Sequence, residues 1–181
     1  MTENQKDNQK DNNKQINTHL DIKRLSILAF FLASAVVLGY LESLIPYDFG
    51  VPGIKLGLPN IVSLIILYLY RGRDAVIVGV LRIFIIGFMF GNMYMIIYSL
   101  SGLLLSLTLM ILLKKSSIFS IIGISVAGAV SHNIGQMIVA YLVVRTTGIL
   151  FYVPILLLSA VIAGICTGVA STSVLKILRK M

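Results

Sequence analysis

Charge is scarce in this sequence, and that scarcity excludes most soluble architectures. Only 12% of the 181 residues are charged, whereas 57% are hydrophobic, and the mean hydropathy is +0.95. A soluble domain of this length needs polar groups over its whole exterior, and this chain has too few to cover one. We therefore expect an integral membrane protein whose outer surface faces lipid.

The sequence also has a single cysteine and no P-loop motif. Cys166 is the single cysteine, which excludes a disulfide framework within one chain and makes a cysteine-based metal site implausible. It stands inside an apolar run, so we interpret it as a small packing residue. The P-loop pattern GxxxxGK[ST] does not occur, so any dependence on ATP has to come from partner proteins. We expect no cofactor and no bound metal.

The net charge of +8 raises nucleic acid as a possible partner. The basic residues, however, stand in short clusters between apolar runs, as membrane-topology signals do. There is no basic domain with interleaved aromatic residues, so we expect no nucleic-acid partner. The partner that the composition predicts is the lipid bilayer.

Six apolar runs follow a polar tail. Residues 1–22 are rich in Asn, Gln, Lys and Asp and have almost nothing to bury, which predicts a disordered cytoplasmic tail. Residues 23–181 are predicted to form one transmembrane domain, an all-α bundle of six helices. The runs cover about 25–45, 54–70, 75–91, 94–113, 118–144 and 149–178. The second and third are short for a span, so five helices with a re-entrant segment is the competing count.

The positive-inside rule tests the six-helix count independently. With the N-terminus in the cytoplasm, the external loops hold only Lys55 and Arg145. Arg82 lies within the third run, and the cytoplasmic segments hold the remaining basic residues beyond the tail: Lys23, Arg24, Arg71, Arg73, Lys114, Lys115, Lys176, Arg179 and Lys180. This alternation favours six helices, both termini in the cytoplasm and a multi-pass location in the cell membrane.

Polar side chains inside the apolar runs are candidate site residues, because each is costly in a bilayer. Most of them are predicted in the outer half of the membrane, as in a pocket that opens to the outside. The candidates for binding a small polar or anionic molecule are Glu42, Asn60, Arg82, His132, Asn133 and Gln136.

Each candidate also has a structural interpretation. Glu42 can cap an interfacial turn, and Asn60 can cap the second helix. Arg82 can pair with Glu42 or extend towards the cytoplasm. His132 and Gln136 share a helix face, and with Asn133 they can join helices to one another.

Small residues form a separate pattern that permits close helix packing. Gly128 and Gly135 flank the polar group of the fifth run. Two further faces serve either internal packing or docking of a partner: Ala29 and Ala33 in the first run, and Gly164 and Gly168 in the sixth.

These residues resemble a known family. The resemblance rests on Leu41-Glu42-Ser43, on the stretch 55–61 (KLGLPNI), on Arg82 and on the stretch 128–136 (GAVSHNIGQ). They look like the Gx transporter family, also labelled heptaprenyl diphosphate synthase component I, over about residues 23–178. That family is similar in turn to the S-components of energy-coupling factor (ECF) transporters.

The resemblance implies a six-helix, substrate-binding subunit that captures a nutrient or cofactor precursor from outside. Such subunits work with a transmembrane coupling subunit and cytoplasmic ATPases, and dock through an alanine-x-x-x-alanine face that Ala29 and Ala33 match. The synthase label implies an alternative, a non-catalytic membrane component of isoprenoid or quinone synthesis. We expect no enzymatic activity, because Asp48 and Asp74 are the only aspartates beyond the tail and cannot form an aspartate-rich Mg²⁺-diphosphate site.

Overall fold

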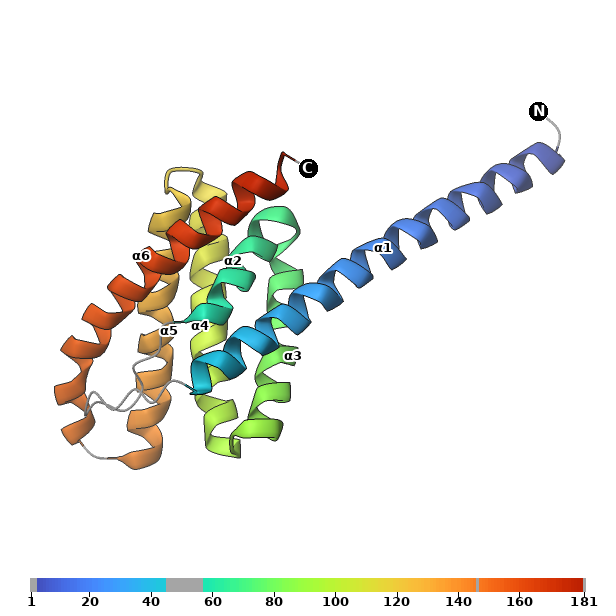
Figure 1. Ribbon diagram of the computed structural model, residues 1–181. Helices are drawn as coiled ribbons and strands as arrows, with labels where there is room; N and C mark the ends of the chain where they lie inside the picture. The colour runs from blue at the N-terminus through green and yellow to red at the C-terminus, as the bar shows by residue number, and fades with distance from the viewer. Residues whose placement is uncertain (1–2, 45–56, 146, 181) are drawn as a thin grey trace.

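A computed structural model describes residues 3–44, 57–145 and 147–180 (Figure 1). These residues form six α-helices and a short 3₁₀ helix, with no strand among them, which confirms the all-α prediction. The elements are α1 (Glu3–Leu44), α2 (Leu58–Leu69), α3 (Gly72–Phe90), α4 (Met93–Ser116), α5 (Ile121–Val144), η1 (Thr147–Tyr152) and α6 (Val153–Leu178).

Four helical segments are long and apolar enough to cross a membrane. They are Asp21–Leu44, Met93–Ser116, Ile121–Val143 and Val153–Leu178. α2 has only 12 residues, which gives a length of about 18 Å at ~1.5 Å per residue. The chain is therefore a multi-pass membrane protein, and the six-span count stays a prediction.

The helices pack as a closed ring. Going round it, α1 contacts α3, then come α4, α5, α6 and α2, and α2 returns to α1. α2 also contacts α3 across the ring (Figure 1). It is largely apolar, and seven of its twelve residues are buried; Leu64, Ile66 and Leu67 lie in the core.

Small residues bring α4, α5 and α6 into close contact. A Cβ atom at Gly135 of α5 would lie 2.7 Å from the backbone oxygen of Ser101 in α4. The hydroxyl of Ser101 also donates a hydrogen bond to the Gly135 carbonyl, at 3.0 Å. At Gly128 the side chains of Met110 and Ser106 in α4 occupy the space that a Cβ would need. The expected close approach at Gly128 and Gly135 is thus confirmed.

Gly164 and Gly168 of α6 lie against the backbone of α5. Their Cβ atoms would come within 2.7 Å of Val126 Cα and 2.9 Å of Ile122 Cα. Of the two roles left open for this face, internal packing is the one that the contacts support. Cys166, on the same helix, is exposed, so its predicted role as a packing residue is wrong for the single chain: it lies on the outward side of α6.

The polar end of α1 differs from expectation. The backbone is helical from Glu3 onward and continues away from the bundle as a single helix (Figure 1). Extending an existing helix adds one hydrogen bond per residue fixed and avoids the cost of a new nucleus. Glu3, Asp7 and Asp11 each precede a lysine by three residues, a spacing that favours helix. The boundary at residue 22 between tail and membrane domain stays a prediction.

Asp74 joins α1 to the start of α3. Both of its carboxylate oxygens accept hydrogen bonds from Arg24 Nη2, at 2.6 Å. One of them also accepts the backbone N–H of Arg71, at 3.0 Å. Lys114, at the same end of the bundle, donates to the Leu67 carbonyl near the end of α2. Some residues of the basic clusters, which we interpret as topology signals, therefore also make contacts that join helices.

Replacing Asp74 tests this junction. Asp74→Ala removes both the ion pair and the helix cap, and loss of the cap alone costs about 1 kcal/mol of stability. Asp74→Asn keeps an oxygen acceptor for the Arg71 N–H, so we expect a smaller loss. The measurement is the unfolding temperature of the purified protein in detergent, with Arg73→Gln at the exposed neighbouring position as control. Equal unfolding temperatures for Asp74→Ala and the unaltered protein would contradict the assignment.

Candidate functional site

A cavity of about 370 Å³ lies among all six helices. It is lined by the C-terminal parts of α1 and α3, the N-terminal parts of α2 and α4 and the middle of α5 and α6, so it extends from the middle of the bundle towards one end. All six residues that the sequence singles out for binding line it. They come from four helices: Glu42 from α1, Asn60 from α2, Arg82 from α3, and His132, Asn133 and Gln136 from α5.

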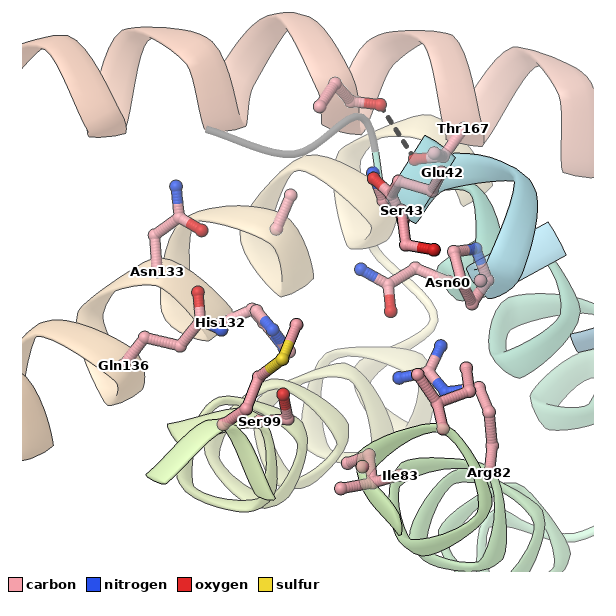
Figure 2. A pocket seen from close by; sticks show the side chains of 18 of the residues that line it. Glu42, Ser43, Asn60, Arg82, Ile83, Ser99, His132, Asn133, Gln136 and Thr167 are labelled. Carbon is pink, nitrogen blue, oxygen red and sulfur yellow. Dashed lines mark hydrogen bonds between the residues drawn. The ribbon is translucent and has the colours of Figure 1, made fainter. Parts of the chain in front are cut away.

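The lining residues form two groups that face each other. Figure 2 shows Glu42, Asn60 and Arg82 on one side and His132, Asn133 and Gln136 on the other. The apolar part of the wall includes Ile83, Ile86, Phe90 and Met95. A mostly apolar cavity with a few convergent polar groups is the usual form of a small-molecule site.

Glu42 connects the end of α1 to the start of α2. Its side chain is only 7% exposed, and Oε1 accepts the backbone N–H of Gly57 at 2.6 Å. Gly57 has a φ of 72°, which glycine adopts without strain. Glu42 therefore makes a structural contact with the start of α2, while the turn that it was predicted to cap lies outside the described residues.

Asn60 is the third residue of α2, because the N-cap is Gly57 and no side chain caps this helix. The capping role considered for Asn60 is therefore wrong: glycine in a left-handed conformation begins the helix instead. The Asn60 amide lies in the cavity between the Glu42 and Arg82 side chains (Figure 2). Lys55, which belongs to the same sequence motif, lies outside the described residues.

Arg82 is the buried cation of the site. It is 6% exposed, and its Nε and Nη1 atoms have no hydrogen-bond partner among the described residues. The predicted extension of this side chain towards the cytoplasm is therefore wrong: the guanidinium is turned into the cavity (Figure 2). Glu42 attracts it electrostatically.

The α5 group combines lining with packing. The His132 ring lies against Gly102 of α4, where a Cβ would come within 2.9 Å of both Cε1 and Nε2. Asn133 donates from Nδ2 to the Leu156 carbonyl of α6, at 2.9 Å, so its amide nitrogen joins two helices. Gln136 lies one turn beyond His132 on the same side of the cavity (Figure 2).

Hydroxyl groups also line the cavity, and they are absent from the sequence-based set: Ser43, Ser99 and Thr167. Thr167 donates to the Ala163 carbonyl within its own helix and pairs with Ser125 of α5 at 2.9 Å. Serine and threonine in helices commonly bond their own backbone. Their positions in the sequence therefore carry little signal for a site.

The helix bundle and its cavity define a class: a multi-pass helical membrane protein with a small, partly polar site at one end of the bundle. The sequence profile of one family, heptaprenyl diphosphate synthase component I, matches residues 31–174. The chain belongs to this family, as its motifs indicated. No curated protein and no solved structure matches the chain.

Proposed function

We propose that this protein is the substrate-binding subunit of an ECF-type importer, which captures a small nutrient or cofactor precursor from outside. The observation that carries the proposal is the cavity itself. Six polar side chains from four helices meet in it, and one is a buried arginine with open donors. Polar groups of this kind inside a membrane bundle mark substrate pathways.

The proposal assigns six membrane crossings, with both termini in the cytoplasm of a bacterial cell. The basic residues beyond the tail support this orientation, because they favour the end of the bundle opposite the cavity. Arg24, Asp74 and Lys114 lie at that end, and the cavity is then near the outer surface. Transport energy would come from ATPases in the cytoplasm, through a transmembrane coupling subunit.

The exposed alanines of α1 are the proposed docking face. Ala29 and Ala33 both lie on the outward side of α1, whereas Gly164 and Gly168 are buried against α5. Small exposed residues allow a partner helix to approach closely. A strip of two exposed small residues at this position suits a coupling subunit in the plane of the membrane.

Enlarging that strip tests the docking role. We expect Ala29→Leu combined with Ala33→Leu to reduce co-purification of the coupling subunit and its ATPases by at least about tenfold, because leucines hold two helix backbones apart. Ligand occupancy should not change. The control is Cys166→Leu, a similar enlargement at an exposed site on α6. Full recovery of the ATPases with the doubly substituted protein would contradict the docking assignment.

The family description supports a second candidate, a non-catalytic membrane component that works with a heptaprenyl diphosphate synthase. At ~30 Å³ per water-sized group, a cavity of about 370 Å³ holds about twelve such groups. A chain of seven isoprene units is roughly three times larger. In this role the protein would therefore contact its partner through its surface. Co-purification of a soluble prenyltransferase without ATPases would favour this candidate.

A further inference from the structure

Arg82 has hydrogen-bonding capacity that its surroundings do not use. The side chain is 6% exposed, and Nε and Nη1 have no partner among the described residues. Burying a cation is unfavourable unless it is paired and hydrogen-bonded. The guanidinium points into the cavity (Figure 2), so a molecule in the cavity is placed to supply the missing acceptors.

Glu42 does not take up these donors. Its carboxylate attracts Arg82 through charge, but Oε1 is bound to the Gly57 N–H, and the Nε and Nη1 atoms of Arg82 are without a hydrogen bond. Glu42 thus offsets part of the positive charge and leaves the directional bonding of Arg82 open. Guanidinium groups form their strongest hydrogen bonds with carboxylates and phosphates.

The start of α2 adds positive potential on the same side of the cavity. Gly57, Pro59 and Asn60 line the cavity, and the first turn of α2 holds no acidic residue. The N-terminus of a helix carries a partial positive charge that favours anions. Pro59 has no N–H and Glu42 already accepts from Gly57, so α2 contributes potential, and Arg82 supplies the direct bonds.

We infer that the site binds a small organic anion, whose carboxylate or phosphate oxygens accept hydrogen bonds from Arg82. This inference rests on the part of the proposed function that makes the cavity the substrate site. The cavity of about 370 Å³, room for about twelve water-sized groups, sets the size of the molecule. Ile83 and Ile86 also line the cavity and offer apolar contacts to the uncharged part of the molecule.

Matched probes that differ in charge test the inference. The full-length protein in detergent is titrated with benzoate, phenyl phosphate and benzamide at constant ionic strength. Apparent dissociation constants come from the concentration dependence of the unfolding temperature. We expect at least one acid to bind tenfold more tightly than benzamide, and Arg82→Gln to weaken that acid at least about tenfold. The stronger acid shows whether carboxylate or phosphate is preferred.

Two variants make the result specific. Arg73→Gln removes an exposed arginine from the same helix and should leave acid binding unchanged. Arg82→Lys keeps the charge but loses the planar fork, so it should bind the acid with intermediate affinity. It also serves as the test if Arg82→Gln does not fold.

The inference is overturned if the folded protein shows no preference for either acid, or if the preference is as strong in folded Arg82→Gln as in the unaltered protein. Where Arg82→Gln does not fold, an undiminished preference in Arg82→Lys overturns it. Benzamide binding that is unaffected by Arg82→Gln but abolished by His132→Ala would overturn the anion site and leave the cavity as a substrate site. Failure to recover a coupling subunit and ATPases would count against the importer role without affecting the anion preference.

Discussion

Gly164→Leu should prevent the bundle from folding. A Cβ at position 164 would lie 2.7 Å from Val126 Cα and 3.2 Å from Val126 N, both backbone atoms of α5. These atoms cannot turn aside as a side chain can, so α5 and α6 have to separate. Overpacking a close contact costs typically about 1–3 kcal/mol, and leucine adds three more carbon atoms at the same place. The yield of monodisperse protein in detergent measures the effect.

A matched pair of alanine substitutions isolates the cause. Gly123→Ala, in the first turn of α5, places a Cβ 3.5 Å from its nearest neighbour, the Ser120 hydroxyl oxygen, which is an ordinary van der Waals distance. Alanine favours helix over glycine by about 1 kcal/mol, so Gly123→Ala should raise the unfolding temperature in detergent. Gly164→Ala gains the same propensity but should lower it. If both substitutions raise the unfolding temperature, the contact between α5 and α6 is looser than the structure indicates.

Local patterns in the sequence predict most of the fold. Apart from the polar start of α1, which is helical from Glu3 onward, the apolar runs place the helices within a few residues of their observed bounds, because a spanning helix has to satisfy its own backbone. The start of α5 was placed at Ile118, and the observed helix begins at Ile121 after the Ser120 cap. The last run is predicted to begin at Ile149, but α6 begins at Val153, because the residues before it belong to η1.

These local patterns do not predict the order of the helices around the ring. It depends on pairs far apart in the chain, such as Ser171 of α6 donating to the Ile61 carbonyl of α2 at 3.4 Å. Only the small residues give a partial signal. They predict that a helix face is closely packed, but Gly164 and Ala29 have the same spacing pattern and opposite exposure.

For the candidate site, the cost of polar groups in a membrane identifies the residues, and the structure brings them to one cavity. What each residue does there depends on distant partners. Glu42 is fixed by Gly57 and Asn133 by Leu156, so both have structural roles that sequence reasoning left as alternatives. Arg82 differs from them, because its donors are directed at the cavity and not at another helix.

Substrate binding should also depend strongly on the polar pair of α5, His132 and Gln136. His132 and Gln136 line the cavity on the side opposite Arg82. Each lost hydrogen bond to a bound molecule costs about 1 kcal/mol or more. We expect His132→Ala combined with Gln136→Ala to lower affinity by at least about tenfold while the amount of folded protein stays near normal. Mass spectrometry of the small molecule that co-purifies in mild detergent, per mole of folded protein, measures the loss.

Two controls separate binding from packing in that experiment. Ile138→Ala changes an exposed residue of the same helix and should leave occupancy unchanged. Asn133→Ala removes the hydrogen bond to the Leu156 carbonyl, so it should lower the unfolding temperature as well as occupancy. If the double substitution destroys the fold and the residual protein binds with unchanged affinity, His132 and Gln136 join helices and do not contact substrate. We expect the doubly substituted protein to fold and to lose its bound molecule. His132 and Gln136 border the cavity, whereas the contact between α5 and α4 is made at Gly128 and Gly135.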